Sequence, residues 1–205
     1  PQAAPQSQCG PDDDRVRSDR KDRARLLDVG CSANLTAHDC LVTAGHCLSP
    51  VGLVNVVEFN VPSSRPDGSL VHPGPEDQYV PTDRRQFLAG EIGNDWGVFT
   101  VYPNSETGLT PLQAQGASVK FAHNLPVVGD EVRVVGYGID DGQDNQTQQS
   151  SSGPVGSVDT QATVLRYRAD TEAGSSGSAV ALAVDGRVVA IHTHGGCTPN
   201  GGSNQ

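Results

Sequence analysis

Residues 170–180, DTEAGSSGSAV, have the composition of a loop that presents one hydroxyl group for chemistry. The stretch is flanked by short runs rich in Val and Ala, which are typical of β-strands. Gly174 and Gly177 permit backbone conformations that other residues avoid, so the loop can turn sharply around Ser176. Such a turn also leaves backbone N–H groups available to stabilise an oxyanion. Ser176 is therefore a candidate nucleophile, although a serine needs a nearby base to become reactive.

Two other motifs supply the acid–base partners that such a serine needs. His46 lies in LVTAGHC, just after an apolar run and immediately before a cysteine that can anchor it through a crosslink. Asp95 lies in GNDWGVF, where apolar neighbours favour burial, and a buried carboxylate needs a partner such as an imidazole N–H. Either residue alone has an ordinary structural explanation. Together, in the order His46, Asp95, Ser176, they predict a general base, the acid that orients it, and a nucleophile.

The elements that must position these residues are short β-strands. Val-rich runs alternate with turns containing many of the 24 glycines and 14 prolines, a pattern typical of β-barrels and sandwiches. The 205 residues suffice for one large all-β domain or two small ones with a hydrophobic core. The pattern breaks around residues 104–117, where we expect the link between two halves.

Charge and cysteine content narrow the classes of function. The chain carries 14 basic and 24 acidic residues, and its net charge of −10 argues against binding nucleic acid or an anionic membrane surface. No apolar run approaches the length that spans a bilayer. Five cysteines without a CxxC pair favour an oxidising, secreted setting and leave one cysteine over.

The first 30 residues are interpreted as an N-terminal extension that leads into the fold. Acidic and basic residues are equally frequent in PDDDRVRSDRKDRARLLD, residues 11–28, so the local charge is near zero. We expect this stretch to form a solvated turn or a short helix rather than a recognition surface.

The motifs LVTAGHC, NDWGVF and GSSGSAV, in this order, resemble those of the chymotrypsin-fold serine proteases, from about Cys31 onward. YRADTEAGSSGSAV followed by VVAIHTHGG is most similar to the bacterial glutamyl endopeptidase branch, and TEAGSSGS is also similar to bacterial lysyl endopeptidases. The resemblance implies an all-β fold of two antiparallel six-stranded β-barrels with the active site in the cleft between them. Residues 31–110 would form the first barrel, with His46 and Asp95, and residues 111–205 the second, with Ser176.

The same resemblance assigns a role to each residue of the site. His46 would accept the proton of Ser176 as it attacks a peptide carbonyl, giving an acyl-enzyme, while Asp95 would hold the imidazole. The N–H groups of Gly174 and Ser176 would form the oxyanion hole.

Two departures from the family pattern stand out. The digestive enzymes carry an aspartate immediately before the nucleophile, which receives the new N-terminus on activation, whereas this chain has Ser175 there. The family also continues after the HTHGG segment into one more strand and a C-terminal helix. This sequence ends at PNGGSNQ, so we expect both to be missing.

The pocket for the residue before the scissile bond allows two interpretations. Thr171 and His192 match positions that bind a substrate carboxylate in glutamyl endopeptidases, which favours Glu, with Asp next. Asp170 matches the pocket carboxylate of trypsin-like enzymes, which would favour Arg or Lys. Thr193, where the family has a hydroxyl that supports the aspartate, and Gly195 complete the set of expected substrate-binding residues.

By the same resemblance, the cysteines pair as Cys31–Cys47 and Cys9–Cys197, and Cys40 is left over. A zinc site of His192, His194 and Cys197 is an alternative, but its spacing is not that of a structural site and no fourth ligand is evident. We therefore expect no metal and no cofactor.

These observations predict a secreted, monomeric serine endopeptidase that acts on proteins or peptides, with no nucleic-acid or membrane partner. The alternative from a different class is a catalytically silent protease homologue that serves as a binding module.

Overall fold

Strands of the N-terminal half form an antiparallel sheet that closes on itself. A computed structural model describes residues 7–49 and 54–205 of the chain. The strands of this sheet are β2 (Arg23–Leu26), β3 (Cys31–Leu35), β4 (Cys40–Thr43), β5 (Val57–Glu58), β6 (Gln78–Tyr79), β7 (Pro81–Ala89) and β8 (Asp95–Val101). Their order is β6-β5-β2-β3-β4-β8-β7. Because only Val80 separates β6 from β7, one almost continuous segment pairs with β5 at one end and with β8 at the other, which closes the barrel.

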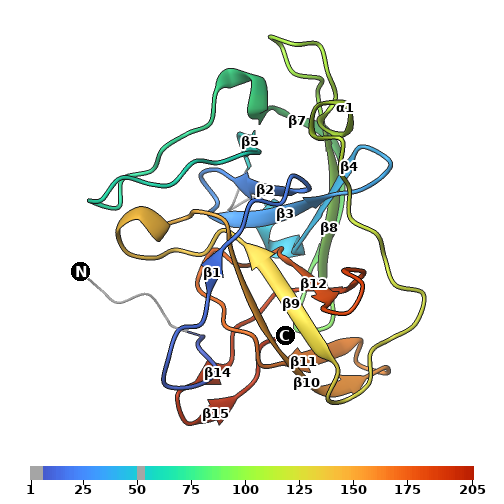
Figure 1. Ribbon diagram of the computed structural model, residues 1–205. Helices are drawn as coiled ribbons and strands as arrows, with labels where there is room; N and C mark the ends of the chain where they lie inside the picture. The colour runs from blue at the N-terminus through green and yellow to red at the C-terminus, as the bar shows by residue number, and fades with distance from the viewer. Residues whose placement is uncertain (1–6, 50–53) are drawn as a thin grey trace.

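The second half forms another antiparallel sheet, drawn below the first in Figure 1. Its strands are β1 (Val16–Arg17), β9 (Glu131–Gly136), β10 (Gln149–Asp159), β11 (Val164–Tyr167), β12 (Ala179–Leu182) and β13 (Val188–Ile191). The order is β1-β10-β9-β12-β13, and β11 also pairs with β10. Alternating apolar side chains of these strands form the second core, around Val132, Val155 and Val180.

Helix is scarce, as an all-β fold requires. Among the described residues the single α-helix is α1 (Pro111–Gln115), in which Thr110 and Gln113 form a capping box at the N-terminus. The 3₁₀ turns are η1 (Gly45–Leu48), η2 (Pro75–Asp77) and η3 (Gly142–Asp144). No helix in the described ranges is long and apolar enough to cross a membrane. The expected all-β, chymotrypsin-like fold is thus confirmed.

The end of the chain takes part in the second sheet, which differs from our expectation of a missing last strand. After the small hairpin of β14 (Cys197–Thr198) and β15 (Gly201–Gly202), Asn204 pairs with Tyr167. The backbone of Gln205 exchanges hydrogen bonds with His194 and accepts one from Thr193. These last residues therefore occupy the sheet position between β11 and the segment after β13.

The expectation of a solvated turn or short helix for residues 11–28 holds only in part: residues 11–21 are mostly exposed, but residues 22–26 are buried and no helix forms. β1 pairs with β10 of the second sheet, whereas β2 lies inside the first sheet, upstream of the expected boundary at residue 31. Arg25 is fully buried, because its guanidinium pairs with the equally buried Glu58 at 2.6 Å. Buried ion pairs, rather than solvent, compensate much of the charge in this segment.

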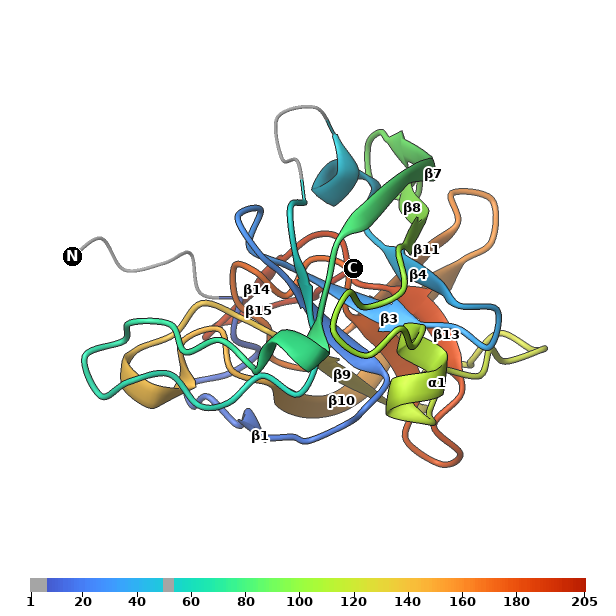
Figure 2. The ribbon, with the colours of Figure 1, turned by 90° about the horizontal axis from the view of Figure 1, so that it is seen from above.

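Two long loops lie side by side at the edge of the molecule, as the view from above shows (Figure 2). The hydroxyl of Ser64 donates to the carbonyl oxygen of Asn145 at 2.7 Å, and the side-chain amide of Asn145 donates to the carbonyl oxygen of Gly68 at 2.8 Å. These contacts join a loop of the first half to a loop of the second.

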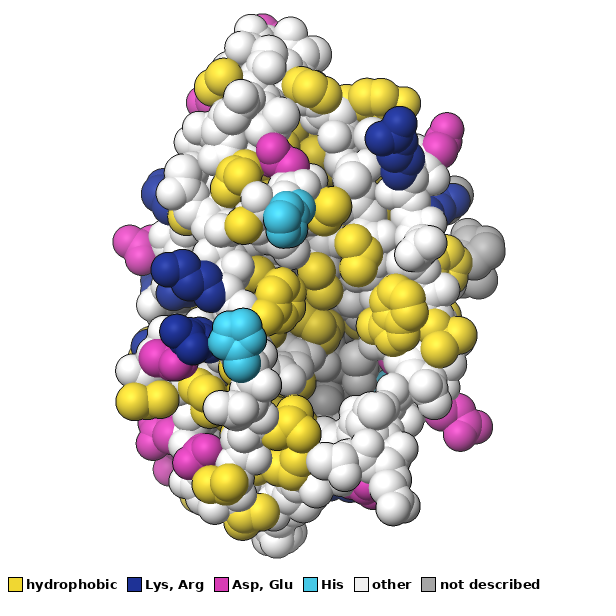
Figure 3. Space-filling model, turned by 90° about the vertical axis from the view of Figure 1, so that its right-hand side faces the viewer, with side chains coloured by type: hydrophobic (Ala, Val, Ile, Leu, Met, Phe, Trp, Pro, Cys, Tyr) yellow, Lys and Arg dark blue, Asp and Glu magenta, His cyan; other side chains and the backbone are white. Residues whose placement is uncertain are grey.

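A different face of the molecule is hollowed at its centre, and hydrophobic side chains gather around the hollow (Figure 3). Exposed apolar side chains of the chain include those of Trp96, Phe121 and Leu125. Apolar surface alone does not identify a ligand.

Polar side chains of β3 cross the contact between the two halves. Asn34 is 1% exposed. Its amide nitrogen donates to the carbonyl of Gly177 at 2.7 Å, and its amide oxygen accepts from the N–H of Ala179 at 3.0 Å. One side chain of the first sheet thus fixes the backbone on both sides of Ser178 in the second half.

We predict that Asn34→Ala lowers the free energy of unfolding by about 2–4 kcal/mol, because a buried polar group left without a partner costs roughly 1–3 kcal/mol. Denaturant unfolding measures the change. The matched control is Asn55→Ala, since Asn55 is exposed and its side chain bonds, within the described ranges, only to the side chain of Asp28. A loss for Asn34→Ala no larger than that of the control would contradict the role assigned to Asn34.

Candidate active site

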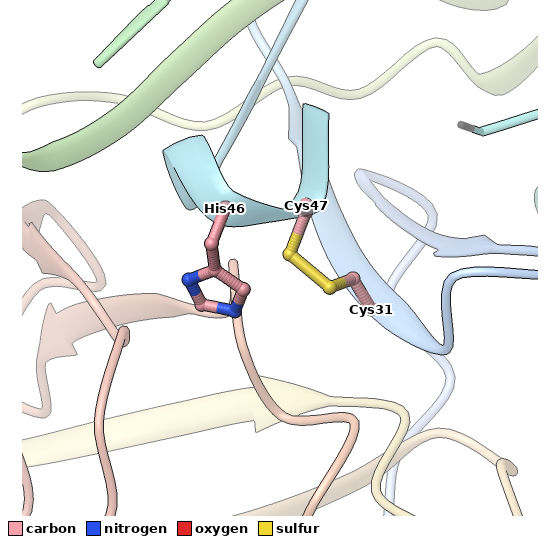
Figure 4. A group of neighbouring side chains, drawn as sticks. All are labelled: Cys31, His46 and Cys47. Carbon is pink, nitrogen blue, oxygen red and sulfur yellow. A yellow bond between two sulfur atoms is a disulfide. The ribbon is translucent and has the colours of Figure 1, made fainter. Parts of the chain in front are cut away.

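His46 is held at the edge of the first barrel by a turn and a crosslink. β4 ends at Thr43, and the turn η1 that follows carries both His46 and Cys47. Cys47 forms a disulfide with Cys31 of β3, so the turn is tied to the neighbouring strand (Figure 4). The His46 side chain stays 43% exposed, which leaves its ring accessible to a substrate.

Asp95, at the start of β8, fixes the orientation of the His46 ring. One carboxylate oxygen accepts the backbone N–H of His46 at 2.8 Å, and the other lies 2.6 Å from ring Nδ1. The Asp95 side chain is 1% exposed, so this carboxylate is shielded from water. Because Nδ1 donates to the carboxylate, Nε2 is left as the basic nitrogen of the neutral ring.

The ligand atoms of Cys31, His46 and Cys47 lie within 4.8 Å of one another, as three metal ligands would. Both sulfurs are consumed in the disulfide (Figure 4), so neither is a thiolate that could bind a metal ion. The cluster therefore serves to anchor His46.

The loop that carries Ser176 packs against β3 beside this anchor. The N–H of Ser32 donates to the carbonyl oxygen of Ser176 at 2.8 Å, and Cys47 Sγ lies 3.9 Å from that oxygen. Gly177 has φ = +88°, and a Cβ there would lie 2.1 Å from the Ser32 carbonyl oxygen, so only glycine fits this close approach.

Within the described residues, no hydrogen bond joins Ser176 Oγ to the His46 ring. Such bonds are often long in ligand-free enzymes and tighten only when substrate binds. The structure thus brings His46 and Asp95 into direct contact and places the Ser176 loop beside them, while the catalytic roles of the three residues stay predictions.

In the part of the chain that the structure describes, three N–H groups of the loop have no protein acceptor, those of Ala173, Gly174 and Ser176, and the last two are the expected oxyanion donors. The carbonyl preceding each of these two is engaged: that of Ala173 accepts from Ile139 N at 2.6 Å, and that of Ser175 accepts from Ser178 N at 3.0 Å. In a trans peptide the N–H points opposite to the C=O. Because these two bonds hold the carbonyl groups of Ala173 and Ser175, the N–H groups of Gly174 and Ser176 point the opposite way. They are therefore available to an oxyanion, as an oxyanion hole requires.

A cavity of about 400 Å³ lies next to Ser176. Three of the expected substrate-binding residues, Thr171, His192 and Gly195, line it together with Ser176 itself. The remaining lining residues are Ser7, Glu172, Ala173, Gly196, Cys197 and Thr198. The cavity is thus walled by the serine loop, by the segment after β13, and by the N-terminal segment.

His192 is buried and electrically neutral at the floor of this cavity. Its Nδ1 lies 2.6 Å from the hydroxyl of Tyr167, which is itself fully buried. Burial, together with the nearby His194 and His46, lowers the pKa of His192 to about 3. When the Tyr167 hydroxyl donates to Nδ1, the imidazole proton resides on Nε2 and is available to a ligand.

Asp170 does not line the cavity. Its carboxylate accepts the backbone N–H groups of Cys9 at 2.6 Å and Asp14 at 2.9 Å, so it is directed at the N-terminal segment. Burial, and the neighbouring Asp14, raise the pKa of Asp170. The structure therefore separates Asp170 from the residues that could contact a substrate side chain.

Thr193 is likewise outside the cavity lining. Its hydroxyl lies 2.9 Å from Nδ1 of His194. The His194 ring packs edge-on against that of His46, with 6.2 Å between centroids. Thr193 therefore contacts the site through His194, and the support that we expected it to give Asp95 stays a prediction.

Two parts of the site lay outside the sequence prediction. Ser7 pairs with Thr171 and forms one wall of the cavity, and Glu172 forms part of another. Burial raises the pKa of Glu172 to about 7, against the lowering effect of nearby Arg15. The Cys9–Cys197 pairing was the one sequence signal that pointed to the N-terminal segment.

The disulfides are those expected from the resemblance. Cys9–Cys197 ties the N-terminal segment to the cavity wall, and Cys31–Cys47 anchors His46. Of the five cysteines, Cys40 is free.

Comparison with known proteins agrees with this architecture. The family described as trypsin-like peptidase domain matches residues 31–191, and no curated protein sequence matches the chain. A Glu endopeptidase solved with MPD is similar in structure, with a TM-score of 0.69, 20% identity, and coverage of 96% of this chain and 91% of that one. The thermostable serine protease AL20, from an extremophilic microorganism, has a TM-score of 0.63, 20% identity, and coverage of 85% and 82%. Protease Anisep from Arthrobacter nicotinovorans has a TM-score of 0.65, 18% identity, and coverage of 93% and 91%.

A sheet that closes into a barrel, a second sheet against it, and a His–Asp pair beside a glycine-flanked serine are features of one class, the serine endopeptidases, which hydrolyse proteins and peptides. Because the family match covers most of its length, the chain belongs to the trypsin-like peptidase domain family.

We predict that His192 makes the folded protein less stable in acid. In the unfolded chain, His192 binds a proton below its ordinary pKa of 6.5, whereas in the folded protein its pKa is lowered to about 3. Between about pH 6.5 and 3, acid therefore favours the unfolded state. Relative to His192→Gln, the wild type should lose up to about 1.4 kcal/mol of stability per pH unit over this window. Urea unfolding of both proteins is measured at several pH values. Subtracting one pH profile from the other removes the contributions of Glu172 and Asp170, which both proteins share. Parallel pH profiles would show that His192 is not held neutral.

Proposed function

We propose that the protein is a secreted serine endopeptidase that uses His46, Asp95 and Ser176 and prefers Glu before the scissile bond. The observation that carries the proposal is the contact of both Asp95 oxygens with His46, beside a serine loop in which the N–H groups of Gly174 and Ser176 have no acceptor among the described residues. Two disulfides support an oxidising, extracellular setting.

In the proposed mechanism, Ser176 Oγ attacks the carbonyl carbon while Nε2 of His46 accepts its proton. Asp95 stabilises the imidazolium that forms, and the N–H groups of Gly174 and Ser176 bind the oxyanion. Collapse of the tetrahedral species expels the amine, which takes the proton from His46 and leaves an acyl-enzyme. Water, deprotonated by His46, then releases the acid.

The preference for Glu rests on the donors of the cavity. Thr171 Oγ1 is buried and makes no hydrogen bond in the described structure, so it can donate to a ligand. His192 is neutral and can donate through Nε2, and Asp170 is held by the N-terminal backbone, where it does not repel a carboxylate. A buried hydroxyl without a partner is costly, and a substrate carboxylate would supply the missing acceptor.

The test is cleavage of a peptide library by the wild type and by three variants. We expect cuts after Glu that are lost in Ser176→Ala. We expect Thr171→Val to lower kcat/KM for Glu peptides by roughly 10-fold or more, because a hydrogen bond to a charged group contributes about 1.5–3 kcal/mol.

Asp170→Asn is the control, expected to leave the preference unchanged. Cuts after Arg or Lys that disappear in Asp170→Asn would overturn the pocket assignment and keep the triad. No cleavage by the wild type would favour the binding module instead.

A further inference from the structure

Arg15 is a buried cation whose partners come from the serine loop and from neighbouring segments of the second half. Its side chain is 5% exposed. Its guanidinium pairs with Asp13 at 2.6 Å and with Asp140 at 2.9 Å, and donates to Gln149 at 3.0 Å. Glu172 of the serine loop lies 3.9 Å away. A cation this buried persists only where its surroundings compensate the charge, so Arg15 holds these groups together.

On one side, Arg15 fixes the segment that orients an oxyanion-hole peptide. Its partner Asp140 follows Ile139 directly, and the N–H of Ile139 donates to the carbonyl of Ala173 at 2.6 Å. This bond determines which way the Ala173–Gly174 peptide faces, and hence the direction of the Gly174 N–H.

On the other side, Arg15 lies against the start of the serine loop. A Cβ at Gly138 would be 3.1 Å from both Arg15 Nη1 and Glu172 Cβ, so the guanidinium is packed directly between the two segments. The Glu172 backbone is bonded in turn to Ser175, whose N–H donates to the Glu172 carbonyl at 2.9 Å. Glu172 Oε2 is buried without a hydrogen-bond partner in the described structure, and Oε1 accepts from Gln8 Nε2 at 3.3 Å and lies 3.9 Å from Arg15. Arg15 is the cation that pairs with this carboxylate.

We propose that Arg15 is the positioning residue of the oxyanion hole: through Asp140 and Glu172 it locks the Ile139–Ala173 contact that directs the Gly174 N–H into the cleft. The inference rests on the proposed function. Without Arg15, Asp140 and Glu172 lose their common counter-ion and the two segments separate. The Ala173–Gly174 peptide is then free to rotate, and transition-state stabilisation is lost while the substrate pocket persists.

The test compares Arg15→Gln and Arg15→Lys with the matched control Arg17→Gln. Arg17 lies on the same N-terminal segment, but its side chain is 51% exposed and pairs with Asp144 at the surface. Kinetics use the best peptide anilide from the library, and thermal unfolding is measured alongside.

We expect Arg15→Gln to lower kcat by about 10- to 100-fold with KM changed less than about threefold, since loss of one whole oxyanion donor costs about 100- to 1000-fold. Arg15→Lys keeps the charge but not the planar guanidinium, so its kcat should lie between those of Arg15→Gln and the wild type. The kcat of Arg17→Gln should match that of the wild type. Methylguanidinium added to Arg15→Ala should restore part of kcat.

Unchanged kcat in Arg15→Gln, or a loss that thermal unfolding fully explains, would overturn the proposal. So would a failure of both Arg15→Gln and Arg15→Lys to fold, because Arg15 would then serve stability alone. If the wild type itself turns over no peptide, the proposed function fails rather than the role of Arg15.

Discussion

The contact between β3 and the serine loop is the constraint on which the site depends. Ser32 and Asn34, both buried, hold the carbonyl groups of Gly174, Ser176 and Gly177 from the first sheet. Ile139 holds the carbonyl of Ala173 as well, and the N–H groups of Gly174 and Ser176 are left without an acceptor among the described residues. The same strand begins at Cys31, whose disulfide anchors His46. β3 thus positions both residues: Cys31 at its start anchors the base His46, and Ser32 and Asn34 hold the loop that carries the nucleophile Ser176.

Electrostatics then distinguish the groups of the site. Asp95 is buried, but two donors on His46 satisfy it, so it can hold and stabilise the ring. His192 is buried with a tyrosine hydroxyl as its partner, and burial keeps it neutral. Backbone donors of the N-terminal segment hold the Asp170 carboxylate away from the cavity. Glu172 does line the cavity, where burial raises its pKa to about 7 and Arg15 lies 3.9 Å from its carboxylate.

The sequence predicted the parts of the structure that local pattern encodes. The Val-rich runs that alternate with turns predicted the all-β fold, and the glycines around Ser176 predicted a sharply turned loop. Both features depend on residues that are neighbours in the sequence. The motifs around His46 and Asp95 predicted a contact that the structure shows. What failed depended on distant partners. The residues 11–28 have no net local charge, and only folding shows that Arg15 and Arg25 meet Asp140 and Glu58 far along the chain. For the same reason Ser7, as a wall of the cavity, had no local signal.

The most direct test of the central claim, that folding makes Ser176 the one reactive serine, is labelling of the wild-type protein with a fluorophosphonate followed by peptide mapping. We predict one adduct per chain, on Ser176, and none when His46 is replaced by Ala, because the hydroxyl is then without its base. A wild-type protein that stays unlabelled, or carries the adduct on another residue, would contradict the claim.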